Sequence, residues 1–512
     1  MINIKDFNIQ RLINVLDNDI NSSWVNILAT HIYHNNNDHY ILYSKEFSHA
    51  HILEDDILQG IPYCEIGTLY EYSLSYFDNS SKTNSGQFYT PHDIAVLMGS
   101  FIQDFNTTKI WLDPCVGSGN LLYGLLKNVN NPETFLRNNI IASDIDSTAL
   151  LIARTLLVLE FEKENDNLFN DIENNFINYN YLSEGNNDTV LPHYDYVIVN
   201  PPYVSKMRNF LFDTDKCGDL YSYFIEKIIK NSDGFIAITP QSFTHAKKFK
   251  PLRKLLLNNK NKSYYYNFDN VPGNIFRGIK FGSQNTNKAN SIRPTIIINN
   301  DKYDTNRITS LLKWKTIQRK ELLENINNDL SNITLNDNIF PKVGECYQNF
   351  YNSIKNNDKL ETIISSSPTD YVLYIPSTPR YYISASKRKL HRSSIKKIYF
   401  NNEENLNIVY VLLNSAYFYW WWRVVDGGMT LSITTIKTLP LLKVDNIETM
   451  VTLLEDSENN NIVSSKNAGK IQENIKHPDN TVKKITCSLT SNDNTILLMK
   501  SRLNSSVELI KN

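Results

Sequence analysis

Between residues 90 and 300, short runs of apolar residues alternate with longer stretches in which apolar residues recur every three or four positions. The short runs predict buried strands, and the longer stretches predict amphipathic helices. The predicted strands lie at 110–113, 139–144, 176–182, 196–199, 234–240 and 295–298, and the predicted helices include 91–102, 149–161 and 219–229. This regular alternation predicts an α/β fold with a doubly wound, mostly parallel sheet.

The predicted strand at 196–199 is entirely apolar and is followed by Asn200-Pro201-Pro202-Tyr203. Proline has no N–H to donate to a strand ladder, so the strand must stop there. The amide of Asn200 is therefore held at the carboxyl end of a central strand, where open α/β sheets bind their ligands. Hydrogen-bond acceptors beside the ring of Tyr203 suit a planar ring that bears an exocyclic amino group.

Two other predicted strands end in carboxylates. Asp113 is followed by the turn Gly117-Ser118-Gly119, in which the glycines let the backbone approach a ligand before a helix begins. A Gly-x-Gly pair is a weak signal by itself, and a plain strand-to-helix turn is the alternative. Asp113 would repel a phosphate but suits the positively charged sulfonium and amino groups of S-adenosylmethionine. Asp144 ends the next strand, where a carboxylate binds ribose hydroxyls.

Three further polar or aromatic positions could complete such a site. Thr90 precedes Pro91 and is a suitable N-cap for the helix that follows. Asn180, near the tip of the third strand, could contact an adenine ring, although a plain loop explains it equally well. Phe276 lies in the loop 271–277 and could be a second wall for a stacked base, with core packing as an equally good interpretation.

The rest of the chain predicts further domains. We expect a helical N-terminal cap over residues 1–80, an α/β domain over 81–300, a separate α+β domain over 301–455, and a polar extension with a C-terminal helix over 456–512. Residues 406–425 predict one long helix whose aromatic residues serve core packing. Residues 371–402 contain several Lys and Arg but no Asp or Glu. Such a basic segment predicts contacts to the phosphates of a nucleic acid, and a solvated cationic surface is the alternative. The cationic residues of this segment are Arg380, Lys387, Arg388, Lys389, Arg392, Lys396 and Lys397.

Composition narrows the classes of function. The net charge of -2 over 512 residues provides no global basic field, so any nucleic-acid surface must be local. The five cysteines are scattered without a Cys-x-x-Cys pair, which favours reduced thiols and argues against a disulfide framework or a metal site. No signal-peptide pattern opens the chain, and the most apolar run, 409–425, is too short and too interrupted to span a bilayer. We therefore expect a cytoplasmic protein without metal or membrane partners.

Four features, in this order, resemble one family: Gln87-Phe88-Tyr89-Thr90-Pro91, Asp-Pro-x-x-Gly-x-Gly from 113, Asn-Pro-Pro-Tyr from 200, and a large C-terminal region. The arrangement is similar to the gamma class of DNA adenine-N6 methyltransferases of restriction–modification systems. The resemblance covers residues 85–300 and implies a class I, Rossmann-like methyltransferase with a C-terminal target-recognition domain. It also implies that S-adenosylmethionine is surrounded by Thr90, Asp113, Cys115, Gly117, Gly119, Asp144, Asn180 and Asn200.

The resemblance further assigns the target base. It implies that Asn200 and the carbonyl of Pro201, in the turn completed by Pro202, bind the target amino group. Tyr203 and Phe276 would stack on the base after it is flipped out of double-stranded DNA. One position departs from the family pattern, because Asn180 stands where relatives often carry Asp.

These residues fit the chemistry of the reaction. The amino nitrogen of adenine is a poor nucleophile, because its lone pair is delocalised into the ring. Two hydrogen-bond acceptors placed out of the ring plane would restore its nucleophilic character, so no strong base is required. The resemblance leaves open whether such an enzyme is solitary or paired with a separately encoded restriction endonuclease. Three alternatives remain. The chain could be an RNA or protein-glutamine N-methyltransferase, a modification subunit that needs a separate specificity subunit, or a DNA-binding module with an inactive core.

Overall fold

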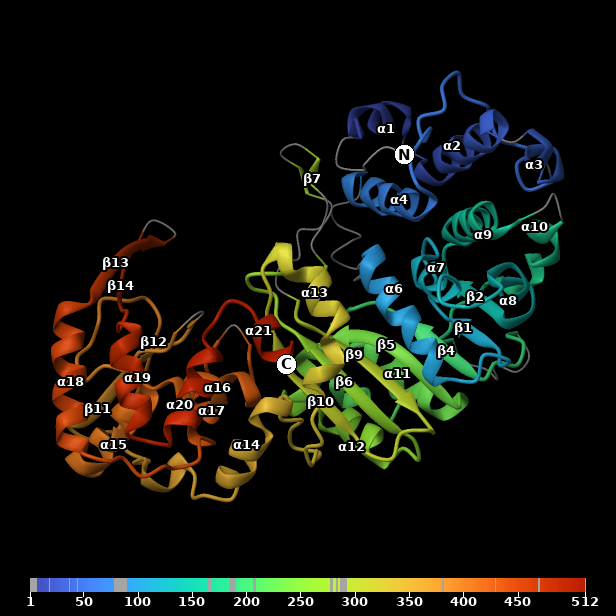
Figure 1. The fold of residues 1–512 in the computed structure, drawn as a ribbon. Helices are drawn as coiled ribbons and strands as arrows, with labels where there is room; N and C mark the ends of the chain where they lie inside the picture. Colours follow the sequence, from blue (N-terminus) through green and yellow to red (C-terminus); the bar gives the residue numbers. More distant parts are fainter. Residues whose placement is uncertain are drawn as a thin grey trace. The chain divides into compact units, whose positions relative to one another are not determined.

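The computed structural model describes residues 7–17, 19–35, 37–43, 45–77, 90–163, 167–183, 190–205, 209–276, 280–281, 284–285, 292–379, 382–428, 430–467 and 470–511. The chain divides into two compact units. One comprises residues 1–243, 247–270 and 274–306, and the other comprises 244–246, 271–273 and 307–512 (Figure 1). The predicted boundary at residue 300 is close to this division. Residues 1–80 and 456–512 belong to these two units and do not form units of their own.

The first unit is built on a sheet whose strands lie in the order β6-β9-β5-β4-β1-β2-β3. Strands β1 to β5 run parallel to one another, whereas β9 runs antiparallel to both β5 and β6. Their bounds are β1 Trp111–Asp113, β2 Ile140–Asp144, β3 Phe176–Asn178, β4 Tyr196–Val199, β5 Gly234–Pro240, β6 Lys262–Phe268 and β9 Pro294–Asn300. The predicted α/β fold with a mostly parallel sheet is confirmed.

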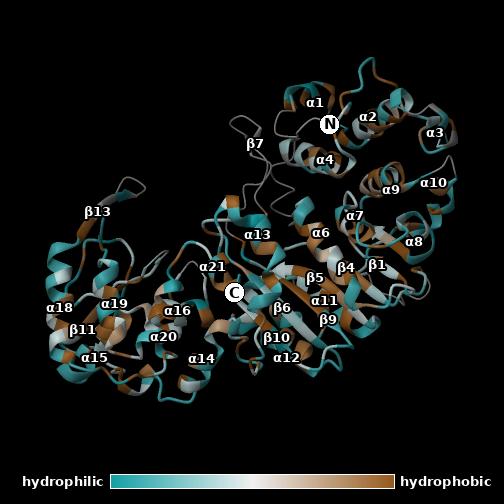
Figure 2. Ribbon diagram, viewed as in Figure 1, coloured by the Kyte–Doolittle hydropathy of each residue, from teal (hydrophilic) through white to brown (hydrophobic). Residues whose placement is uncertain are grey.

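The central strands are apolar because helices cover the sheet. All four residues of β4 are buried, as are the first six of β5, and Figure 2 shows apolar colouring in the central part of this sheet. The covering helices are α6 His92–Ser100, α7 Asn120–Leu126, α8 Pro132–Asn139, α9 Ser147–Phe161, α10 Leu168–Asp171, α11 Leu220–Asn231 and α12 Lys250–Asn258. A short hairpin pairs β7 Lys280–Phe281 with β8 Gln284–Asn285.

Two glycines set the distance between α6 and α7. A Cβ added at Gly99 would lie 2.1 Å from the carbonyl oxygen of Gly124, and one added at Gly124 would lie 2.1 Å from that of Ala95. The helices therefore pack backbone against backbone. This contact holds the start of α6, which follows Thr90, beside the turn that leads from β1 into α7.

The predicted N-terminal cap consists of helices packed on the α/β core. They are α1 Ile9–Val15, α2 Ile20–Asn35, α3 Asn37–Leu42 and α4 Tyr63–Phe77. Helix α4 packs against α7 and α9, and α2 packs against α4 and α9 (Figure 1). The side chain of Trp24 is fully buried and donates a hydrogen bond of 2.7 Å to Ser73 Oγ, which fastens α2 to α4.

The second unit mixes helices with short sheets. It contains β10 Arg307–Leu312, α13 Arg319–Glu324, α14 Gln348–Ile354, β11 Tyr371–Pro376, β12 Ile395–Phe400, α15 Glu403–Leu413, α16 Ala416–Val425, α17 Ile433–Lys437, α18 Ile447–Asn460, β13 Ile462–Asn467, β14 Lys470–Ile475, α19 Asp479–Cys487, α20 Asn492–Lys500 and α21 Val507–Ile510. Strands β11 and β12 form an antiparallel pair, as do β13 and β14.

Two predictions for this unit are corrected. The single helix expected over 406–425 is two helices, because Asn414 exchanges hydrogen bonds with the backbone of Ala385 and Ser415 caps α16 by accepting from Phe418 N. The described residues of 456–511 form a hairpin and helices instead of a loop-like extension, and side chains such as Ile485 and Leu498 are fully buried. The aromatic residues of α16 are buried, as expected for core packing.

Among the residues that the structure describes, we find no helix with the length and apolar character needed to cross a membrane.

Candidate active site

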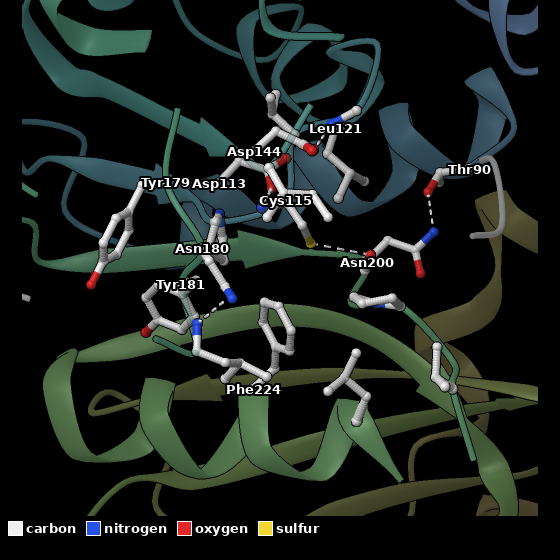
Figure 3. A pocket seen from close by; sticks show the side chains of 18 of the residues that line it. Thr90, Asp113, Cys115, Leu121, Asp144, Tyr179, Asn180, Tyr181, Asn200 and Phe224 are labelled. Atoms are coloured by element: carbon white, nitrogen blue, oxygen red, sulfur yellow. Dashed lines mark hydrogen bonds between the residues drawn. The ribbon is translucent and has the colours of Figure 1, made fainter. Parts of the chain in front are cut away.

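A cavity of about 490 Å³ lies at the carboxyl ends of β1, β2 and β4. Figure 3 shows side chains from these strand ends and from α11 converging on it. Most residues that were predicted to bind a ligand line this cavity, namely Thr90, Asp113, Cys115, Gly117, Asp144, Asn180, Asn200 and Pro202. The cavity brings together residues that are more than 100 positions apart in the sequence, such as Thr90 and Asn200.

The turn after β1 is shaped by its glycines and by carboxylates. Gly117 and Gly119 have φ values of +51° and +90°, a conformation that favours glycine. Gly119 does not reach the cavity but caps α7, where a Cβ would lie 3.2 Å from Ala153 Cβ. Asp113 Oδ1 accepts from Cys115 N at 3.1 Å, and Asp144 Oδ2 accepts from Gly117 N at 2.9 Å. The two acidic residues therefore hold the turn in place.

Asp113 is the most unusual group in the cavity. Its side chain is 1% exposed, and its Oδ2 has no hydrogen-bond partner among the described residues. Burial raises the pKa of Asp113 to about 8, with a further contribution from the charge of Asp144, although Cys115 N–H acts in the opposite direction. Burial also raises the pKa of Asp144. A buried carboxyl oxygen without a partner lacks a cationic or hydrogen-bond-donating group, and a positively charged ligand would supply one.

Asn200 is held from three directions. Its Nδ2 donates to Thr90 Oγ1 at 2.9 Å, and the Tyr203 hydroxyl donates to its Oδ1 at 2.7 Å. The same hydroxyl lies 3.0 Å from the carbonyl oxygen of Ile238, and the Cys115 thiol donates to the carbonyl of Asn200 at 3.4 Å (Figure 3). These contacts fix which way the amide points. The hydroxyl of Thr90 accepts a hydrogen bond from Asn200. The predicted contact between Thr90 and a cofactor stays a prediction.

The two aromatic residues predicted to stack on a base face each other edge to face. Their ring centroids are 6.1 Å apart with an interplanar angle of 67°, and Phe276 is 1% exposed. Neither Tyr203 nor Phe276 is among the residues that line the cavity. Stacking on a target base therefore stays a prediction.

Sequence reasoning missed several residues that line the cavity. Phe224 comes from α11 and stacks on Tyr181, with ring centroids 5.6 Å apart, close to Asn180 (Figure 3). The α11 pattern predicts an amphipathic helix, but nothing in it distinguishes Phe224 from a core residue. Glu71 comes from α4, in the N-terminal region where no chemistry was predicted.

The cationic segment of the second unit is partly neutralised. Lys387 pairs with Glu455 at 2.7 Å and Arg388 with Glu458 at 3.0 Å, both acids being on α18. Arg392 donates to the backbone oxygen of Glu473 and to Asn474. Lys389 and Lys397 are exposed and Lys396 is half-buried, whereas Arg380 lies outside the described residues. The predicted DNA contacts stay a prediction, most directly for these three lysines.

Comparisons with known proteins agree with the motifs. Residues 64–217 match the family model described as N-6 DNA Methylase. Over 204 residues the chain is 29% identical to the Type II methyltransferase M.VspI of Vibrio sp. (strain 343), an alignment that covers 38% of this chain and 46% of that protein. The chain thus spans less than half of the length of this relative.

The solved structures to which the chain is similar include the DrdV–DNA complex and the type IIG restriction endonuclease BpuSI. The first is 14% identical, covers 70% of this chain and 44% of that chain, and has a TM-score of 0.44. The second is 11% identical, covers 99% of this chain and 79% of that chain, and has a TM-score of 0.43.

The strand order, with its antiparallel β9, and the cavity at the carboxyl ends of the parallel strands define a class I, Rossmann-like methyltransferase fold. Within that class, the resemblance to DNA adenine-N6 methyltransferases that the sequence predicts is confirmed by the family match over residues 64–217.

Proposed function

We propose that the chain is a site-specific DNA methyltransferase that transfers a methyl group from S-adenosylmethionine to the N6 amino group of a flipped-out adenine. The observation that supports this most directly is the amide of Asn200, held between Thr90 and Tyr203 at a cavity in which one buried carboxyl oxygen, Asp113 Oδ2, has no partner among the described residues. The proposal includes double-stranded DNA as the substrate and a cytoplasmic site of action, with the enzyme either solitary or paired with a separately encoded restriction endonuclease.

The residues of the cavity fit S-adenosylmethionine. Asp113 would hold the cationic amino group, which would satisfy its unpartnered oxygen, and Asp144 at the tip of β2 would hold the ribose. Phe224 and Asn180 would contact the adenine ring of the cofactor. When bound, the cofactor supplies a methyl group carried on a positively charged sulfur.

The part played by the turn 200–203 is to prepare the target nitrogen. Asn200 Oδ1 and the carbonyl of Pro201 would accept the two hydrogens of the amino group, which turns the lone pair of the nitrogen out of the ring system. An amide oxygen has two lone pairs, so Oδ1 can accept from the target and from Tyr203 at once. A rigid pair of acceptors contributes orientation and charge stabilisation and requires no strong base.

The first experiment incubates the purified protein and tritiated S-adenosylmethionine with genomic DNA, bulk RNA and a protein extract in parallel. We expect label in DNA as N6-methyladenine. Label only in RNA or only in protein would overturn the assignment of the substrate. A lack of label in all three, with the cofactor still bound, would favour a modification subunit that needs a specificity partner.

The role of Asn200 is tested by Asn200→Ala. We expect transfer to fall by at least about 100-fold, as for the loss of other preorganised transition-state contacts, while cofactor affinity changes little. Asn231→Ala, at an exposed position on α11, is the matched control. Wild-type turnover in the Asn200 variant would disprove the role of the amide.

A further inference from the structure

Helix α4 of the N-terminal region lies directly on the turn that forms the cavity. A Cβ added at Gly67 would lie 2.5 Å from Ser118 Oγ, so only a glycine lets the helix approach so closely. Three residues further along α4, the Tyr70 hydroxyl donates to Asp146 Oδ2 at 2.7 Å. Helix α4 is thereby fixed against both the turn after β1 and the N-cap of α9.

The residue after Tyr70 is Glu71, which lines the cavity. Its Oε1 lies 3.6 Å from the position that a Cβ of Gly117 would occupy. Asp144 Oδ2 accepts a hydrogen bond from the backbone N–H of the same glycine. The carboxylates of Glu71 and Asp144, which are 73 positions apart in the sequence, therefore flank one glycine of the cavity wall.

The cavity carries an independent sign of a missing ligand, because Asp113 is 1% exposed and its Oδ2 has no hydrogen-bond partner among the described residues. Asp113 can satisfy a cationic group of the ligand. Both oxygens of Asp144 already accept backbone N–H groups, Oδ1 from Asp146 and Oδ2 from Gly117. A ribose presents two neighbouring hydroxyl donors, and Asp144 has only its remaining lone pairs to offer them.

We propose that Glu71 is a cofactor-binding residue, which the N-terminal region contributes as a second carboxylate for the ribose hydroxyls beside Asp144. The inference rests on the proposed cofactor. It gives α4 a direct part in the cofactor site, in addition to its packing on α7 and α9.

The test measures ligand binding by isothermal titration calorimetry on the full chain. The variants are Glu71→Gln, which keeps the shape of the side chain, and Glu71→Asp, which keeps its charge. Glu54→Gln is the control, because Glu54 is exposed and belongs to the same N-terminal region. The first two ligands are S-adenosylhomocysteine and 5′-methylthioadenosine, which lacks the amino-acid part. The other two are adenosine and 2′,3′-dideoxyadenosine, which lacks the two ribose hydroxyls.

We expect Glu71→Gln to weaken both S-adenosylhomocysteine and 5′-methylthioadenosine by about 10- to 100-fold, the range for losing a hydrogen bond to a charged group. The binding of 2′,3′-dideoxyadenosine should not change. If Glu71→Gln lowers the melting temperature of the free protein, Glu71→Asp should show the same selective loss without destabilisation.

Three results would overturn the inference. Wild-type affinities in both Glu71 variants would leave Glu71 only a structural role. A loss confined to S-adenosylhomocysteine would place Glu71 at the amino-acid part of the cofactor. If the wild-type protein bound none of the ligands, the cofactor assignment would fail together with the inference. Normal ligand binding without methylation of DNA would instead overturn the proposed function alone.

Discussion

The ionisation of Asp113 couples the cofactor site to stability. Burial raises the pKa of Asp113 to about 8, whereas the pKa of an Asp side chain in an unfolded chain is about 3.9. Between these values the folded chain holds a proton that the unfolded chain has lost. The contribution of Asp113 to stability is therefore complete below about pH 4 and is lost as the pH rises towards 8.

We therefore predict that Asp113→Asn raises the melting temperature by several degrees at pH 8, since a shift of roughly four pKa units corresponds to an upper limit on the order of 5 kcal/mol, and changes it little near pH 4. At low pH the neutral acid and the amide are nearly equivalent. Thermal unfolding of the free protein between pH 4 and pH 8.5 measures the difference. The exposed Asp55→Asn is the control. Identical pH profiles for wild type and Asp113→Asn would contradict the raised pKa.

At the scale of elements, the contact between α6 and α7 links packing to the site. Helix α7 begins directly after Gly119, and α6 begins two residues after Thr90, whose carbonyl accepts from Asn120 Nδ2 at 3.2 Å. A displacement of either helix would therefore disturb Thr90 and the turn after β1 together. Gly99 and Gly124 allow the two helix backbones to touch at the crossing, and this close contact opposes such a displacement.

Gly124→Ala tests this link. The new Cβ would lie 2.1 Å from the carbonyl oxygen of Ala95. Because this oxygen belongs to the backbone, one of the two helices would have to shift to relieve the clash. We predict a loss of about 1–3 kcal/mol of stability, the usual cost of overpacking, with weaker cofactor binding in the fraction that still folds. Denaturant unfolding and calorimetry measure the two effects. Gly428→Ala is the control, because its Cβ would meet only the side chain of Asp426. Equal stability of the two variants would refute the link.

Sequence patterns predict those elements whose signals are local. The strands of the sheet and the residues at their tips follow from apolar runs that end at Asp113, Asp144 and Asn200, because parallel strands bring their carboxyl ends to one edge. The break between α15 and α16 was not predictable, since it depends on the backbone of Ala385, 29 residues from Asn414. Glu71 was missed for the same reason, because its neighbours lie on a distant turn.

At the scale of the whole molecule, the net charge of -2 leaves DNA binding to local groups. Within the cationic segment of the second unit, Lys387 and Arg388 are committed to Glu455 and Glu458 on α18. These two pairs stabilise the unit and are poor candidates for phosphate contacts. Lys389, Lys396 and Lys397 are better candidates, because no ion pair involves them among the described residues.

The combined replacement of Lys389, Lys396 and Lys397 by alanine tests this distinction. Each phosphate contact adds about 0.9 to the slope of log affinity against log salt concentration, so we predict that the slope falls in magnitude by about 2–3. Affinity should fall equally for specific and unrelated DNA, because phosphate contacts carry no sequence information. Fluorescence anisotropy over a range of salt concentrations measures both quantities. Lys320→Ala is the control, since its side chain is 89% exposed. An unchanged slope in the triple variant would exclude these lysines as phosphate contacts.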